Sequence, residues 1–115
     1  MTHHMEIILN KENKSYAVKV TAEENGTILG SAYLYIMFND LHKEPFGFLE
    51  NVFVKEENRG KGIGSKLVEA VITEAKRQNC YKLIGTSRYE NPEVHTFYNK
   101  LGFKDYGKEF RIDLS

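Results

Sequence analysis

The stretch "NRGKGIGSKL", residues 58–67, is the strongest local signal for the fold of this chain. It places Gly60, Gly62 and Gly64 at alternate positions, directly before a helical pattern. Glycine loses more conformational freedom on folding than any other residue, so three in one turn indicate that something approaches the main chain closely. A helix that begins here presents unpaired N–H groups and the positive end of its dipole, which together favour phosphate oxygens.

Spacing separates the phosphate-binding turns that this stretch could form. A P-loop needs two glycines five residues apart, but the residue five after Gly60 is Ser65. A dinucleotide-binding turn needs a third glycine three residues after the second, and counted from Gly62 that position is again Ser65. A tight connection, with glycines that serve only helix–strand packing, stays open, although it explains one glycine more easily than three.

The sequence on both sides of the turn predicts a βαβ unit. Residues 48–54, "FLENVFV", are typical of a strand. After Ile63 the apolar positions recur at helical spacing to about Asn79, and residues 81–87, "YKLIGTS", are again typical of a strand. We expect the two strands to be parallel, with a right-handed crossover.

Antiparallel strands are predicted before this unit. Residues 16–22, "YAVKVTA", alternate as a half-buried strand does. Asn25 and Gly26 predict a tight hairpin turn, because a primed turn needs two residues at positive φ. The partner strand, residues 28–38, is almost continuously hydrophobic, which predicts burial on both faces.

A second helix and further strands are predicted after the unit. Asn91 is a suitable N-cap, Pro92 is typical of a first helical position, and Gly102 is typical of a helix end. Residues 103–114 can form two short strands around Gly107. The predicted fold class is α/β: a central sheet, antiparallel first and parallel in the middle, with flanking helices.

Composition limits the class of protein. A length of 115 residues with 41% hydrophobic content suits a single domain over residues 1–115. Sixteen basic and sixteen acidic side chains give zero net charge, which argues against nucleic acid or an anionic membrane as partner. Neither a membrane-spanning run nor a signal pattern is present, and the lone Cys80 fits a reducing compartment, so we expect a cytoplasmic protein.

Two segments carry a resemblance to a known family. Residues 52–75, "VFVKEENRGKGIGSKLVEAVITEA", resemble the acetyl-CoA-binding signature of the GNAT acetyltransferase superfamily through Arg59, Gly62 and Gly64. Residues 91–103, "NPEVHTFYNKLGF", are similar to a later helix of that family. Two ordered motifs are more specific than the glycine turn alone, and the resemblance covers roughly residues 16 to 115.

The resemblance implies an N-acetyltransferase with acetyl-CoA as cosubstrate. Main-chain N–H groups of residues 60–65 would hold the pyrophosphate, and the pantetheine would run along the strand that ends at Val54. The acyl group would lie where this strand and residues 81–87 splay apart. The cofactor-binding residues implied in this way are Phe53, Val54, Arg59, Gly60, Lys61, Gly62, Ile63, Gly64, Ser65, Asn91 and Tyr98.

Acetyl transfer to an amine needs a deprotonated amine, a stabilised oxyanion and a departing thiolate. Glu50 is the candidate for deprotonating the amine, as a general base or as an acceptor-binding group. Alternation along the strand puts Glu50 on the face of Val52 and Val54. Equally, its carboxylate could lie in solvent at the start of the strand. The resemblance points to a main-chain N–H near Phe53 or Val54, freed by a bulge, for the oxyanion. It also points to Tyr98 as proton donor to the coenzyme sulfur, although Tyr98 could simply pack on its helix stripe.

The N-terminal region departs from the family pattern. Typical members have two helices between their first and second strands, whereas only residues 10–15 separate the apolar residues 6–9 from Tyr16. We therefore expect an acceptor site that is open, which suits a peptide amine, or completed by a homodimer, which suits a small-molecule amine. Direct transfer in a ternary complex is the favoured function, and a non-catalytic acyl-CoA sensor or regulatory module is the alternative. No metal site is predicted.

Overall fold

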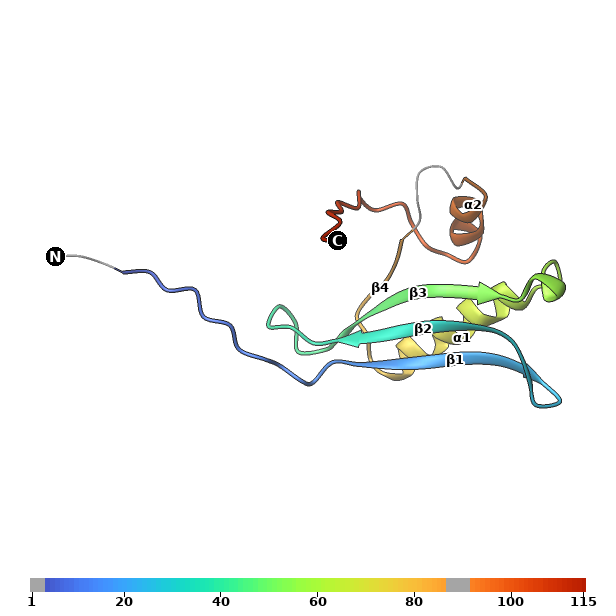
Figure 1. Cartoon of the computed structure of the whole chain (residues 1–115), viewed down its shortest axis with the longest axis horizontal. Coiled ribbons are helices and arrows are strands. Elements are labelled where there is room, and N and C mark those ends of the chain that lie inside the picture. The colour runs from blue at the N-terminus through green and yellow to red at the C-terminus, as the bar shows by residue number, and fades with distance from the viewer. Residues whose placement is uncertain (1–3, 87–91) are drawn as a thin grey trace.

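The computed structural model describes residues 4–86 and 92–115 and shows a mixed α/β fold (Figure 1). Its elements are β1 (Tyr16–Glu24), β2 (Thr27–Met37), β3 (Phe46–Val54), the 3-10 helix η1 (Glu56–Asn58), α1 (Ile63–Arg77), β4 (Leu83–Gly85) and α2 (Pro92–Lys100). One sheet has the order β1-β2-β3-β4, with antiparallel pairs up to β3 and a parallel β3–β4 pair. The predicted fold class is confirmed.

The predicted βαβ unit is formed by β3, α1 and β4. Gly62, at φ 78°, is the N-cap of α1, and the helix ends at Arg77, two residues before the predicted end. Asn79 has φ 63°, a left-handed conformation that turns the chain towards β4. The glycine turn therefore connects a strand to a helix, as its position in the sequence predicts.

The core lies between α1 and one face of the sheet (Figure 1). Its fully buried members are Ala32, Leu34, Ile36, Leu49, Leu67, Val68, Val71 and Ala75. On β2 these residues alternate with Tyr33, Tyr35 and Met37, which are only half-buried on the other face. The prediction that β2 is buried on both faces is therefore wrong, because α1 covers one face of β2 and no described helix covers the other.

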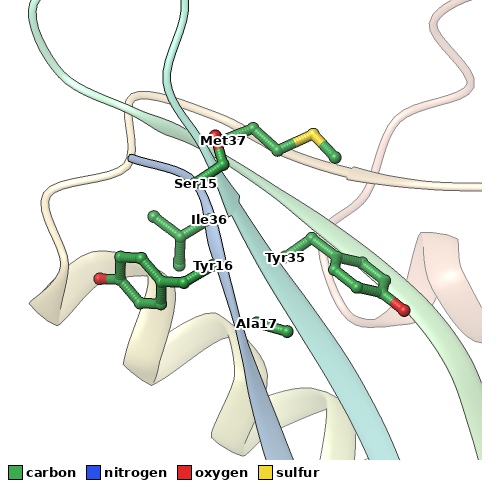
Figure 2. Close-up of a pocket in the computed structure, with 6 residues that line it drawn as sticks. All are labelled: Ser15, Tyr16, Ala17, Tyr35, Ile36 and Met37. Carbon is green, nitrogen blue, oxygen red and sulfur yellow. The ribbon is translucent and has the colours of Figure 1, made fainter. Parts of the chain in front are cut away.

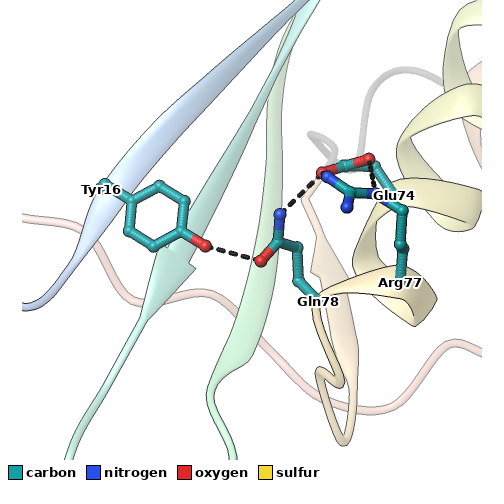
Figure 3. Close-up of polar contacts among 4 residues, drawn as sticks. All are labelled: Tyr16, Glu74, Arg77 and Gln78. Carbon is teal, nitrogen blue, oxygen red and sulfur yellow. Dashed lines mark hydrogen bonds and ion pairs between the residues drawn. The ribbon is translucent and has the colours of Figure 1, made fainter.

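The hairpin turn is confirmed, with Asn25 at φ 51° and Gly26 at φ 79°. At the other end of β1, the Tyr16 hydroxyl donates to Gln78 Oε1 at 2.7 Å and so ties the strand to α1 (Figure 3). Gln78 Nε2 donates to Glu74 at 2.8 Å, and Arg77 donates two hydrogen bonds to the same carboxylate, at 2.9 and 2.6 Å. This network fixes the end of α1 against the edge of the sheet.

Residues 4–15 and 104–115 form no helix or strand. The prediction of two strands around Gly107 is wrong, because a strand needs a neighbouring strand to receive its hydrogen bonds and no described strand pairs with these residues. Apolar side chains such as Phe110 and Ile112 are 90% and 79% exposed. In the part of the chain that the structure describes, no helix is long and apolar enough to cross a membrane.

Acid stability should depend on Glu74. The hydrogen bonds from Arg77 and then Gln78 lower the pKa of Glu74 from 4.5 to about 2. A pKa that is lower in the folded state stabilises the fold above the unfolded value, and this stabilisation disappears as the pH falls from 4.5 towards 2. Denaturant unfolding of Glu74→Gln should therefore show a smaller loss of unfolding free energy than wild type between about pH 5 and pH 2.5.

Glu69→Gln is the control, because Glu69 lies exposed on the same helix and its side chain has no hydrogen bond or ion pair among the described residues. Equal acid sensitivity of Glu74→Gln, Glu69→Gln and wild type would contradict the prediction.

Candidate active site

The glycine turn has two glycines that the backbone requires and one that it does not. Gly60 and Gly62 have φ angles of 81° and 78°, where a side chain is strained. Gly64 lies inside the first turn of α1 without a positive φ, and a Cβ built on it would meet only Val54 Cγ2, at 3.9 Å. Neither conformation nor packing within the described chain explains a glycine at position 64.

The first turn of α1 is open to a ligand. No side chain caps the helix, and its first turn holds no acidic residue. The Lys66 N–H makes the first helical hydrogen bond, to the Gly62 carbonyl at 3.2 Å, so the N–H groups of Ile63, Gly64 and Ser65 precede the helical ladder. Such groups favour an anion.

The turn is tied to the end of β3. Lys55 N–H donates to the Leu29 carbonyl at 3.0 Å. Hydrogen-bonded positions alternate along an antiparallel strand, so the N–H and C=O of Val54, opposite Gly30, are directed away from β2. The Val54 carbonyl accepts a hydrogen bond from Arg59 Nε at 3.1 Å. Arg59 therefore lies on the same side of β3 as the Val54 N–H, which is free of main-chain partners among the described residues.

The parallel strands separate on that side. Pairing between β3 and β4 runs from Gly47 and Leu83 to Leu49 and Gly85. Beyond this point β3 continues to Val54, whereas β4 has ended. The end of β3, its free Val54 N–H and the start of α1 thus lie at one edge, beyond the carboxyl ends of two parallel strands, a common position for ligand sites in α/β sheets.

A bulge in β3 changes the face of Glu50. Tyr33 pairs with Glu50 but Ser31 pairs with Phe53, so β3 has one extra residue between them, and Asn51 has φ 57°. Before the bulge Glu50 follows the face of Tyr33; after it Val54 lies on the core face. The prediction that Glu50 shares a face with Val52 and Val54 is wrong, because simple alternation does not include the inserted residue.

Glu50 is exposed on the sheet face that α1 does not cover. Phe53, which pairs with Ser31 on that face, is 50% exposed. The bulge also explains Gly30, because a Cβ there would lie 2.6 Å from the Phe53 carbonyl oxygen. The predicted bulge is present and begins at Asn51, two to three residues before the N–H groups of Phe53 and Val54 for which it was expected.

Tyr98 lies against the end of β4. A Cβ on Gly85 would be 3.7 Å from Tyr98 Cζ, and the Tyr98 ring centroid is 5.2 Å from that of Phe103. Burial raises the pKa of Tyr98, so its phenol is neutral and a proton donor at neutral pH. Its hydroxyl has no hydrogen-bond partner within the described residues. Tyr98 therefore packs on the apolar stripe of its helix and still has a hydroxyl that could donate a proton.

Of the other predicted site residues, Lys61 is exposed in the turn, and Asn91 lies outside the described residues. Across residues 4–86 and 92–115 no group of His, Cys, Asp and Glu side chains is arranged to hold a metal ion. A cavity of about 300 Å³ lies away from the turn, between the first residues of β1 and the last of β2. Figure 2 shows Tyr35 and Met37 on one side of these strands and Tyr16 and Ile36 on the other.

Sequence reasoning missed one group of side chains on the uncovered face. Lys19 pairs with Tyr33, and Tyr33 pairs with Glu50, so the three lie side by side on neighbouring strands. The Lys19 ammonium lies 5.7 Å from the centre of the Tyr33 ring. The hairpin turn alone would have placed Lys19 opposite Ala32, and only a register shift between Ala22 and Glu23 moves it opposite Tyr33.

Comparison with known proteins gives a family match over most of the chain. A family described as "Acetyltransferase (GNAT) family" matches residues 2–103. A glucosamine 6-phosphate N-acetyltransferase from Trypanosoma brucei brucei is 32% identical over 93 residues, which cover 80% of this chain and 61% of that protein. An aminoglycoside N(6')-acetyltransferase from Stenotrophomonas maltophilia is 28% identical, over 77% of this chain and 60% of that protein.

Solved structures show the same fold. A protein described as a putative acetyltransferase from Agrobacterium tumefaciens has a TM-score of 0.80 and 35% identity, and the match covers 84% of this chain and 68% of that one. The chain spans about three fifths of the length of the curated relatives that it matches.

Replacement of Gly64 should separate fold from ligand binding. Gly64→Ala should leave the fold as stable or stabilise it by about 0.5–1 kcal/mol, because alanine is the better helix former and the site has space. If a phosphate group approaches this main chain, the same change should weaken acetyl-CoA binding by about three- to tenfold in calorimetry.

Gly107→Ala is the control, since a Cβ there meets nothing within 4 Å, as a Cβ at Gly64 meets only Val54 Cγ2 at 3.9 Å, and Gly107 lies far along the chain from the turn. Unchanged acetyl-CoA affinity in Gly64→Ala would show that no ligand approaches position 64.

Proposed function

Because this chain belongs to the GNAT acetyltransferase family, we propose that it transfers an acetyl group from acetyl-CoA to a primary amine. The observation that carries this proposal is Gly64, a helical glycine that neither backbone conformation nor packing requires, beside uncapped N–H groups. A coenzyme A pyrophosphate that contacts this main chain would account for it. The acyl group would then lie along the end of β3, near the N–H of Val54.

Transfer is proposed to be direct, within a ternary complex. A covalent acyl-enzyme would need an activated nucleophile. Burial raises the pKa of Cys80, which keeps its thiol protonated, and the residue packs against the core near the end of α1. The amine therefore attacks the thioester carbonyl itself: a C–N bond forms, the C–S bond breaks, and the amine loses a proton.

Glu50 is proposed to bind the acceptor ammonium and to remove its proton, directly or through a water molecule. Its exposure on the uncovered sheet face gives an acceptor free access. A bulge separates Glu50 from Val54 on β3, so that the Glu50 side chain lies on the uncovered face and the Val54 N–H is directed away from β2. One strand can therefore supply both the base and an oxyanion donor. Tyr98 is proposed to protonate the departing coenzyme thiolate.

The acceptor is proposed to be a small-molecule amine. The relatives named above act on glucosamine 6-phosphate and on aminoglycosides, both of which are small amines. A homodimer that covers the open sheet face would complete such a site. A non-catalytic acyl-CoA sensor remains the second candidate, because the acceptor face is uncovered in this structure.

Two measurements test the proposal. Calorimetry with acetyl-CoA tests the cofactor, and release of coenzyme A thiol across amino sugars, polyamines, amino acids and peptides tests catalysis. Absence of acetyl-CoA binding would overturn the cofactor assignment. Tight binding without thiol release across the whole panel would favour the sensor.

Glu50→Gln should lower the rate of thiol release by about a hundredfold, because the amide cannot accept the proton of the amine. Acetyl-CoA affinity should stay unchanged, since Glu50 lies on the sheet face away from the Gly64 turn. Glu24→Gln is the control, as Glu24 is exposed beside the hairpin turn. Full activity of Glu50→Gln would remove Glu50 from the mechanism.

Tyr98→Phe should lower the rate more modestly, by about tenfold or less, because a thiol of pKa about 8.5 is already a fair leaving group. The ring contacts with Phe97 and Phe103 remain, so thermal stability should be unchanged. Tyr106→Phe is the control, since Tyr106 is 96% exposed. A rate equal to wild type would leave Tyr98 with a packing role only.

A further inference from the structure

The uncovered sheet face carries a cation, an aromatic ring and a carboxylate in one row. Lys19 of β1, Tyr33 of β2 and Glu50 of β3 are successive partners across the sheet. Neighbouring strands lie about 4.8 Å apart, so the Cα atoms of Lys19 and Glu50 are about 10 Å apart with Tyr33 between them. The three side chains therefore face the same space from neighbouring strands.

The two charged side chains of this row, Lys19 and Glu50, have no ion-pair partner within the described part of the chain. Neither Lys19 nor Glu50 forms an ion pair among the described residues, where the ion pairs join Arg77 to Glu74 and Arg111 to Asp113. The contact of Lys19 is with the Tyr33 ring, a cation–π interaction that is worth about 0.5–1 kcal/mol at an exposed site. Such a contact positions the ammonium and leaves its N–H donors available.

The aromatic part of the row is wider than one ring. Tyr35 follows Tyr33 on the same face, and their rings are stacked with centres 6.0 Å apart and planes inclined by 16°. Both residues are half-buried. A ligand that spans from Lys19 to Glu50 would therefore cross a surface of aromatic edges, which suits an apolar or sugar-like body.

We propose that this row recognises an amine acceptor that also carries an anionic group. The reacting ammonium binds Glu50, a phosphate or carboxylate of the same molecule binds Lys19, and its body lies against Tyr33 and Tyr35. The inference rests on the proposed function, because it places the acceptor at Glu50. It makes Lys19 a specificity-determining residue, which holds the acceptor but takes no part in the proton transfer.

Matched pairs of acceptors test this inference. One pair is an amino-sugar phosphate and the same amino sugar without phosphate; the other is 6-aminohexanoate and its amide. Binding of each compound is measured by calorimetry with coenzyme A present, and acetyl transfer is measured separately by thiol release. The first pair tests for phosphate and the second for carboxylate.

Wild type should prefer an anionic member by about fivefold, and added salt should weaken the preference. Lys19→Met, which keeps most of the side-chain volume, should abolish the preference and raise KM while kcat is retained. Lys82→Met is the control, because Lys82 also lies over aromatic rings, 5.4 Å from the centre of Phe46, which is the first residue of β3, four residues before Glu50.

Equal binding of both members of each pair to wild type, or a preference that survives in Lys19→Met, would overturn the inference. So would a peptide amine that is preferred over every small acceptor without dependence on Lys19. Lys19-dependent binding without acetyl transfer would support the inference and refute the proposed catalysis. Acetyl transfer without any preference for an anionic acceptor would support the proposed catalysis and refute the inference.

Discussion

The point at which β3 and β4 stop pairing is the constraint on which the candidate site depends. Up to Leu49 and Gly85 the two strands share hydrogen bonds, and beyond them β3 continues without β4 and is paired with β2 only. A strand that has lost a neighbour has free main-chain groups on one side, and here these include the N–H of Val54. Tyr98 contacts the end of β4 and the glycine turn follows the end of β3, so both flank this opening.

Because of the bulge in β3, the proposed acceptor-binding residue and the residue proposed to lie near the acyl group are on opposite faces of one strand. Because Asn51 adopts a left-handed conformation, the strand gains one residue between Glu50 and Phe53. Glu50 therefore lies on the uncovered face, whereas the Val54 side chain lies on the core face. The Val54 carbonyl accepts a hydrogen bond from Arg59 of the glycine turn. A regular strand would have put both on one face, and an acceptor and a coenzyme would then have to approach from the same side.

Much of the fold could be predicted because its signals are local. Asn25 and Gly26 form the turn that their conformational preferences indicate, and Gly62 and Gly102 begin and end helices at positive φ. The errors concern partners that are distant in sequence. The strands predicted around Gly107 have no partner strand among the described residues, and no described helix lies on the outer face of β2, although both sequences have suitable composition.

The sequence by itself determined the glycine turn, the βαβ unit and the family, since backbone preference, helical periodicity and motif spacing are properties of neighbouring residues. Only the tertiary structure decided the face of Glu50, the register that joins Lys19 to Tyr33, and the contact of Tyr98 with Gly85. The physical reason is that each depends on one inserted residue or on packing between separate elements. A shift of one residue moves every following side chain to the other face of a strand.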